Sequence, residues 1–174
     1  MTIKIPGEIP AAIPEKMRAI SIGEDNSPAS LTLTEHNTPR PNTHEILVKI
    51  GAAGVNRGDC YQRMGFYPPP SGASEIMGLE FAGTVVACGS DVTRWQPGAR
   101  IAGLVAGGGY AEYGIVHEDH ALEIPENMSF TDAAALPEPH RLARRDRAVG
   151  ERDGCAAGDE HARSARLGRA RRRV

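Results

Sequence analysis

Apolar and polar positions alternate along short stretches of the chain, in the pattern of half-buried β-strands. The clearest case is residues 46–55, where Ile46, Val48 and Ile50 alternate with positions that include Lys49. Two earlier segments have a similar composition and are bounded by turn residues, namely residues 17–22 and 31–34. We therefore expect three antiparallel strands in the first third of the chain.

A second series of strand-like segments begins after residue 79. It comprises residues 80–88, 101–105, 110–116 and 121–124. In the first of these, Ala82 and Gly83 leave room for a neighbouring backbone to approach closely inside a bent sheet. The pattern predicts a mainly β fold with few short helices, arranged as a bent antiparallel sheet or partial barrel.

Two short helices are expected between and after these strands. Asn56 is a suitable N-cap for a helix over residues 56–64. Ser129, with Asp132 three residues later, forms a carboxylate variant of the capping box. That pair opens a helix predicted to run through Ala135.

The chain lacks the alternation of strands and helices that builds a doubly wound dinucleotide-binding domain. No G-x-G-x-x-G lies between a strand and a helix, although pyrophosphate recognition requires this motif. The three glycines at residues 107–109 precede an alternating segment, so we expect them to form a sharp turn. A Rossmann domain is therefore expected to be absent from this sequence.

The two ends differ in composition from the middle. Pro6, Pro10 and Pro14 disfavour regular structure in residues 1–16, which we interpret as an N-terminal arm. Residues 139–174 hold 11 Arg against five acidic residues and no Ile, Phe, Tyr, Trp, Met or Lys. Such a segment cannot bury enough apolar surface to offset its conformational entropy, so it is expected to be a disordered Arg-rich tail.

Two origins are open for this tail. Its bias towards Arg, Ala and Gly is expected of out-of-frame codons in a GC-rich gene, and we favour a frameshift. The alternative is a genuine basic tail that binds nucleic acid or an acidic partner, although charge alone is weak support for it.

Cysteine and hydropathy patterns constrain the location of the protein. Cys60, Cys88 and Cys155 show no C-x-x-C spacing, so neither a disulfide framework nor a structural zinc site is indicated. No stretch approaches the ~20 apolar residues of a membrane span, and residues 1–16 lack the order of a signal peptide. We expect a soluble cytoplasmic protein with no membrane partner.

Five motifs carry the functional information in the chain. They are GVNRGD at residues 54–59, RMGFYPPP at 63–70, GLEFAG at 78–83, GGGYAEY at 107–113 and TDAAALPE at 131–138. In this order they resemble the catalytic domain of the medium-chain dehydrogenase/reductase superfamily, specifically its zeta-crystallin-like quinone oxidoreductases. The resemblance implies a GroES-like catalytic domain over residues 17–138.

The resemblance also implies an activity, namely hydride transfer from NADPH to a small-molecule quinone or enone. Because the Rossmann half is expected to be absent, we do not expect this chain to bind NADPH stably or to be active alone. The rival hypothesis is a non-enzymatic binding module whose basic tail contacts nucleic acid or an acidic partner. The sequence leaves the oligomeric state open.

The resemblance identifies two positions where zinc enzymes of the superfamily carry Cys and His. Asn56 and Leu79 stand there, and neither is an adequate zinc ligand. The sequence therefore predicts a zinc-independent member with no metal site.

Three residues are predicted at the active site. Asn56 and Asp59 are assigned to cofactor binding in the cleft; the alternatives are that Asn56 caps the helix and that Asp59 stabilises its first turn through the helix dipole. Tyr67 matches an active-site tyrosine of the resembled enzymes and is the predicted catalytic residue, whereas Tyr61 on the preceding helix is expected in the core. Glu80 is expected to be a hydrogen-bonded partner of nearby backbone, or alternatively a carboxylate tuned by burial.

Overall fold

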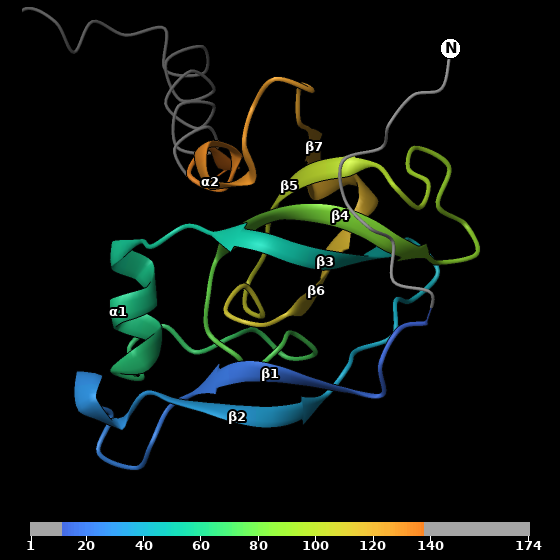
Figure 1. The fold of residues 1–174 in the computed structure, drawn as a ribbon. Coiled ribbons are helices and arrows are strands. Elements are labelled where there is room, and N and C mark those ends of the chain that lie inside the picture. Colours follow the sequence, from blue (N-terminus) through green and yellow to red (C-terminus); the bar gives the residue numbers. More distant parts are fainter. Residues whose placement is uncertain (1–11, 138–174) are drawn as a thin grey trace, which may run out of the picture. The chain divides into compact units, whose positions relative to one another are not determined.

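A computed structural model describes residues 12–137 of the chain. In chain order, its elements are β1 (Lys16–Ser21), β2 (Thr32–Asn37), β3 (Glu45–Ala53), α1 (Arg57–Arg63), β4 (Glu80–Cys88), β5 (Arg100–Leu104), β6 (Tyr113–His117), β7 (Ala121–Glu123) and α2 (Phe130–Ala133). Two single turns of 3₁₀ helix lie at Pro28–Ser30 and Glu118–His120. The predicted mainly β fold with few short helices is confirmed (Figure 1).

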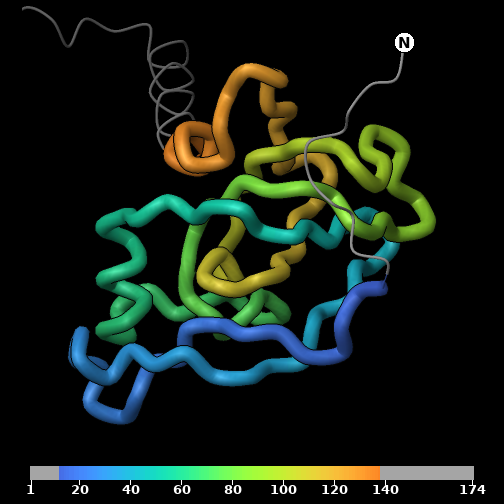
Figure 2. Tube along the Cα trace, viewed as in Figure 1, coloured from blue at the N-terminus to red at the C-terminus, as the bar shows by residue number. Residues whose placement is uncertain are grey.

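The strands form two antiparallel sheets. β1 pairs with β2, and the larger sheet has the order β6-β3-β4-β5-β7. The β3–β4 register shifts between Leu47 and Val48 and again between Ile50 and Ala52. Since bulges of this kind bend a strand and increase its twist, they account for the predicted bend of the sheet. Figure 2 shows the chain path through both sheets.

The core lies on the faces of β3 and β4, where the alternating residues Ile46 and Val48 are buried and Ile50 is partly buried. Ile46, Val48, Phe81, Val85 and Ile101 have no exposed surface and pack into one cluster. β4 is buried along most of its length because it lies between β3 and β5 in the larger sheet.

One strand begins later than predicted. The segment from Tyr110 to Glu112 was expected to open β6, but β6 starts at Tyr113. The Ile20 N–H donates to the Tyr110 carbonyl at 2.9 Å, and Ala111 forms an isolated bridge with Ala19. These residues therefore connect β1 to the larger sheet, which a local alternation pattern does not reveal.

The second helix is shorter than predicted. α2 ends at Ala133, with Ala134 as its C-cap, rather than running through Ala135. Its start is as expected, because the Asp132 N–H donates to the Ser129 hydroxyl at 3.1 Å. The Asp132 carboxylate accepts a hydrogen bond from that same hydroxyl at 2.7 Å.

The predicted segments at the two ends fall largely outside the described residues. Only 12–16 of the proposed arm are described, and β1 already begins at Lys16. The predicted Arg-rich tail, 139–174, lies outside them entirely. Within residues 12–137, no helix has the length and apolar character needed to cross a membrane.

Candidate active site

The start of α1 lies against the start of β4. Asn56, the N-cap residue of α1, donates from its side-chain amide to Glu80 Oε1 at 2.8 Å. Glu80 is the first residue of β4 and only 2% of its surface is exposed. The prediction of a buried, hydrogen-bonded Glu80 is correct, and the Asn56 side chain is one of its partners.

Gly54 makes this contact sterically possible. A Cβ atom placed on Gly54 would lie 2.1 Å from Glu80 Oε1, far inside van der Waals contact. The Gly54 N–H also donates to the Glu80 carbonyl at 3.3 Å. The absence of a side chain at residue 54 therefore allows the Glu80 carboxylate to lie directly beneath the chain that enters α1.

Asp59 stabilises the start of α1 through hydrogen bonds that its carboxylate accepts. Its Oδ2 accepts hydrogen bonds from the Asn56 backbone N–H at 2.6 Å and from the Tyr110 hydroxyl at 2.8 Å. The residue is 3% exposed. Its Oδ1 is buried and has no hydrogen-bond partner among residues 12–137. Asp59 therefore closes a capping box with Asn56, beyond the dipole effect expected for it, and one buried carboxylate oxygen remains able to accept a hydrogen bond.

Tyr110 is a member of this cluster that the sequence did not identify. Its hydroxyl contacts the Gly54 carbonyl at 3.3 Å as well as Asp59. Burial raises the pKa of Tyr110, and the hydrogen bond to Asp59 and the charge of that carboxylate raise it further. The phenol is thereby kept neutral as a donor. In the sequence, the signal for this role of Tyr110 was its position directly after the three glycines of residues 107–109.

The glycines of the GGGYAEY motif allow two backbone segments to pack together. Gly108 has φ of +93°, which confirms the predicted sharp turn. The Tyr110 N–H donates to the Met77 carbonyl at 2.9 Å, and the Gly109 N–H donates to the Gly78 carbonyl at 3.1 Å. This packing fixes the position from which Tyr110 reaches Asp59.

Gln62 connects α1 to the two segments that contain Gly78 and Ala106. Its role was also not predicted from the sequence. Its side-chain nitrogen donates to the Ala106 carbonyl at 2.9 Å, and its oxygen accepts from the Gly78 N–H at 3.1 Å. Only 8% of the residue is exposed. Gln62 thus positions the helix while Asp59 and Asn56 fix its first turn.

The two positions compared with zinc ligands lie close together but do not form a ligand set. The Asn56 amide is bonded to Glu80, and the Leu79 side chain packs against Gly58, where an added Cβ would lie 2.5 Å from Leu79 Cδ1. Among residues 12–137, no three His, Cys, Asp or Glu side chains gather as a metal-binding group.

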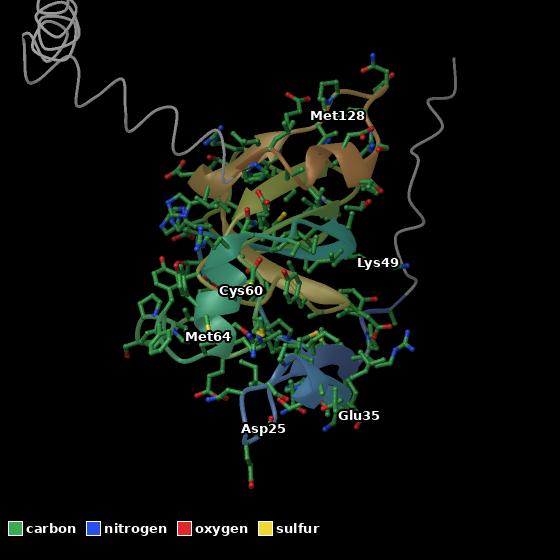
Figure 3. The ribbon with its side chains drawn as sticks, turned by 90° about the vertical axis from the view of Figure 1, so that its left-hand side faces the viewer. Asp25, Glu35, Lys49, Cys60, Met64 and Met128 are labelled. Atoms are coloured by element: carbon green, nitrogen blue, oxygen red, sulfur yellow. The ribbon has the colours of Figure 1, made fainter. Side chains whose placement is uncertain are left out.

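Tyr67 lies on the loop that follows α1. Its backbone N–H donates to the Tyr61 carbonyl at 3.2 Å, and 47% of the residue is exposed. No hydrogen bond within the described part of the chain joins its phenol to the Asn56 and Asp59 cluster. The expectation that Tyr61 lies in the core is wrong, because it is 41% exposed on α1, the helix that carries Cys60 and is followed by Met64 (Figure 3).

Comparison with known proteins identifies this arrangement. Residues 42–126 match the alcohol dehydrogenase GroES-like domain. The chain is 34% identical over 131 residues to the quinone oxidoreductase of Lama guanicoe, covering 74% of this chain and 40% of that protein. It is 33% identical over 120 residues to a quinone oxidoreductase of Pseudomonas aeruginosa, covering 68% and 37% of the two chains.

Solved structures agree with the sequence comparison. The quinone oxidoreductase from Coxiella burnetii superimposes with a TM-score of 0.67 at 28% identity, covering 78% of this chain and 45% of that one. The chain thus spans about two fifths of the length of the curated relatives it matches. The described fold is therefore a GroES-like domain of the alcohol dehydrogenase type, and over 74% of its length the chain is homologous to quinone oxidoreductases of the medium-chain dehydrogenase/reductase superfamily.

Proposed function

We propose that this chain provides the catalytic domain of an NADPH-dependent quinone oxidoreductase, which transfers a hydride to a quinone or an enone. The observation that carries the proposal is the hydrogen bond between Asn56 and Glu80. Asn56 is a neutral amide held by a buried carboxylate, and the resemblance aligns it with the position where zinc enzymes of the superfamily present a thiolate. The names of the relatives support the substrate class.

The donor set argues for a reaction without zinc. A zinc site needs thiolate, imidazole or carboxylate ligands in a tetrahedral arrangement. Asn56 offers an amide that already has a partner, and Leu79 offers a hydrocarbon side chain packed on Gly58. We therefore propose that the substrate oxygen is polarised by hydrogen bonds rather than by a metal.

One feature at the start of α1 supports the binding of a nicotinamide cofactor, namely a hydrogen-bond acceptor that has no partner among the described residues. Asp59 Oδ1 is a buried acceptor without a partner among the described residues, and Asn56 lies one turn before it. We assign both residues to cofactor binding and Tyr67, whose phenol is half exposed on its loop, to orienting or protonating the quinone oxygen. NADPH, when bound, supplies the hydride.

We further propose the domain limits and setting expected from the sequence. Residues 17–138 form the catalytic domain, residues 1–16 an arm, and residues 139–174 an Arg-rich tail produced by a change of reading frame. The cytoplasm is the proposed compartment. The relatives' remaining three fifths would supply the dinucleotide-binding half, and without it this chain is expected to hold NADPH weakly and to be inactive.

A second function is favoured by one observation, the segregation of charge along the sequence. The segment 139–174 has a net charge of +6, against −8 for residues 1–138. This asymmetry suits a binding module whose tail contacts nucleic acid or an acidic partner. Salt-dependent retention of the chain on duplex DNA, lost when residues 139–174 are removed, would favour this function.

The test of the enzymatic proposal is a chimaera. Residues 1–138 are joined to the part of the Coxiella burnetii enzyme that follows its matched segment, and NADPH oxidation is followed with 1,4-benzoquinone. The chimaera is expected to turn over and the 174-residue chain is not. A folded chimaera that binds NADPH but reduces no quinone or enone would overturn the proposal, and robust turnover by the short chain would overturn the need for the second half.

The assignment of Tyr67 is tested separately in the same chimaera. Loss of a hydrogen bond made mainly in the transition state costs about 1–3 kcal/mol, roughly 5- to 150-fold in kcat, and this is expected for Tyr67→Phe. Tyr61→Phe, a phenol of similar exposure on α1, serves as the control. An unchanged kcat in Tyr67→Phe would contradict only the role of that residue.

A further inference from the structure

A shallow, open groove lies where β1 and β2 meet the larger sheet (Figure 1). Its volume is about 380 Å³, and its lining comes from β1, β2, the end of β3 and residues 109–112. Asn56, Asp59 and Tyr67, to which the proposed reaction is assigned, do not line it. The groove is therefore a surface that the reaction itself leaves unexplained.

Residues 110–112 join the two sides of the groove. The Glu112 N–H donates to the Arg18 carbonyl at 3.0 Å, and the Ile50 N–H donates to the Glu112 carbonyl at 2.9 Å. The segment thus bridges β1 and β3. Because Ala52, Ala53 and Ala111 in the lining have small side chains, a depression remains beside the larger residues of β1 and β2.

An apolar cross-strand pair lines the side formed by β1 and β2. Ile20 and Leu33 are register partners in this antiparallel sheet, so their side chains lie on the same face. Leu33 is 59% exposed and Ile20 is partly buried. Accessible apolar surface of this kind is stabilised when a hydrocarbon group covers it.

The charged side chains of the groove are already paired with each other. Arg18 Nε and Nη2 donate to Glu112 Oε1 at 2.9 and 2.6 Å, and the Arg18 backbone N–H donates to Glu112 Oε2 at 2.8 Å. Among the described residues that line the groove, no other is charged. An ionic ligand would have to compete with this pair, so the groove suits an uncharged, apolar group.

Tyr110 connects the groove to the candidate active site. It lines the groove, and its hydroxyl contacts Asp59 Oδ2 at 2.8 Å and the Gly54 carbonyl at 3.3 Å. On the other side of the groove, Ala53 directly precedes Gly54 in the chain. The groove therefore begins beside the residues at the start of α1 that the proposed reaction uses.

We propose that this groove binds an aliphatic chain carried by the quinone substrate, whose ring lies at the candidate active site. The substrate class is then an alkyl-substituted quinone, and Ile20 and Leu33 are the specificity-determining residues that contact its chain. The inference rests on the proposed function for the identity of the ring. The chain is assigned from the apolar lining and from its continuity with the site.

The probes are tetramethyl-1,4-benzoquinone and the analogue in which a hexyl group replaces one methyl group. Both rings are fully substituted and so resist addition of the exposed Cys60 thiol. Calorimetric titration of the 174-residue chain compares their dissociation constants. Because the additional CH₂ groups would be covered on one side by the groove, the hexyl quinone should bind at least about tenfold more tightly.

Leu33→Thr removes apolar surface from the groove and places in β2 a residue type that the strand already holds at Thr32 and Thr34. It should reduce the preference for the hexyl quinone to less than about threefold and leave the affinity for tetramethylbenzoquinone unchanged. The matched control is Leu122→Thr, which replaces an exposed leucine of β7 outside the groove. This variant should keep the full preference.

Three results would overturn the proposal. The first is that the hexyl quinone does not bind or binds no more tightly than tetramethylbenzoquinone. The second is an equal preference in Leu33→Thr and Leu122→Thr, both folded by circular dichroism. The third is a dimer in sedimentation velocity that Leu33→Thr abolishes, because a second copy would then cover the groove. The titrations need no hydride transfer, so failure of the proposed reductase activity is seen separately, as a chimaera without turnover.

Discussion

The hydroxyl of Tyr110 donates a hydrogen bond to Asp59 Oδ2 at 2.8 Å, joining the glycine turn to the first turn of α1. Asp59 receives a second hydrogen bond from the Asn56 N–H on the same oxygen. Because both donors converge on a carboxylate that is 3% exposed, the orientation of Asn56 towards Glu80 depends on a residue 51 positions away from Asp59. The candidate site is therefore held by a tertiary contact as well as by its own helix.

Tyr110→Phe is expected to destabilise the fold by about 1–3 kcal/mol, because it removes a donor from a buried carboxylate. Urea unfolding at pH 7 measures this loss. Tyr61→Phe, which removes an exposed phenol from α1, should change the free energy of unfolding little. Equal effects of the two substitutions would contradict the role given to Tyr110.

The raised pKa of Tyr110 also predicts a pH dependence. A phenol whose pKa is higher in the folded state stabilises the fold fully below its unfolded pKa of about 10. That contribution is lost as the pH rises above this value towards the folded pKa. The unmodified chain should therefore lose stability above about pH 10 more steeply than Tyr110→Phe, as followed by circular dichroism.

Asn56→Asp is expected to create a conflict with Glu80. The substitution replaces a donor by a second carboxylate about one hydrogen-bond length away from a buried one. Two adjacent carboxyls share a proton, so the pKa of the pair rises and the fold is stable at low pH and weakened as the pH increases. We expect a loss of about 1–3 kcal/mol at pH 8 that shrinks towards pH 4.

Urea unfolding at the two pH values measures this change. Asn127→Asp, the same substitution at an exposed position before α2, provides the control for the added charge. A loss for Asn56→Asp that was equal at both pH values would show that the carboxylate pair is not the cause.

Local patterns predicted most of the strands because both the alternating segment of β3 and the continuous apolar run of β4 mark strands that are buried in this sheet. Val48, one of the alternating apolar residues of β3, is fully buried. The start of β6 was misplaced because Tyr110 and Ala111 bond to β1, a pairing set by tertiary structure. Strand boundaries that depend on distant partners are not encoded in a local alternation.

The site was predicted only in part for the same reason. Asn56 and Asp59 lie in one short motif, and their capping contact is local. Tyr110 and Gln62 reach partners 51 and 44 residues away in the sequence, so their roles emerge only when the chain is folded. Tyr61 was misplaced because helical position alone does not say which face of α1 is covered.

Glu118→Gln is expected to loosen the segment from Thr93 to Trp95. The N–H groups of Thr93 and Arg94 donate to the Glu118 carboxylate at 3.1 and 3.2 Å, and these bonds hold its pKa below the usual range. A carboxylate with a lowered pKa stabilises the fold above its unfolded pKa of about 4.3, and the contribution disappears as the pH falls through the folded value.

Thermal unfolding at pH 7 and pH 3, followed by Trp95 fluorescence, checks this prediction. The melting temperature of Glu118→Gln should lie below that of the unmodified chain at pH 7, and the difference should narrow at pH 3. Glu123→Gln, an exposed carboxylate on β7, should show no such difference at either pH.

The folded chain should purify without stoichiometric zinc. Asn56 and Leu79 supply no suitable ligand, and their side chains already contact Glu80 and Gly58. Elemental analysis of the zinc content after dialysis against a chelator tests this prediction, together with the melting temperature before and after dialysis. One retained zinc per chain, with a melting temperature that falls on its removal, would contradict the zinc-independent proposal.

Gly78→Ala should be among the most damaging substitutions in the domain, because two effects combine at this position. Gly78 has φ of +102°, which L-residues rarely adopt, and an added Cβ would lie 2.7 Å from the Gly109 Cα and from the Tyr110 nitrogen. Gly72 has φ of +87° with nothing within 4 Å of an added Cβ, so Gly72→Ala isolates the conformational effect. We expect Gly72→Ala to lower the free energy of unfolding by about 1–2 kcal/mol. Gly78→Ala should lose a further 1–3 kcal/mol or more from the backbone clash, about 2–5 kcal/mol in all.

The same clash would push Tyr110 away from Asp59. Adding Tyr110→Phe to Gly78→Ala should therefore lower the free energy of unfolding by less than Tyr110→Phe does alone. A fully additive double variant would show that the glycine contact does not position the phenol.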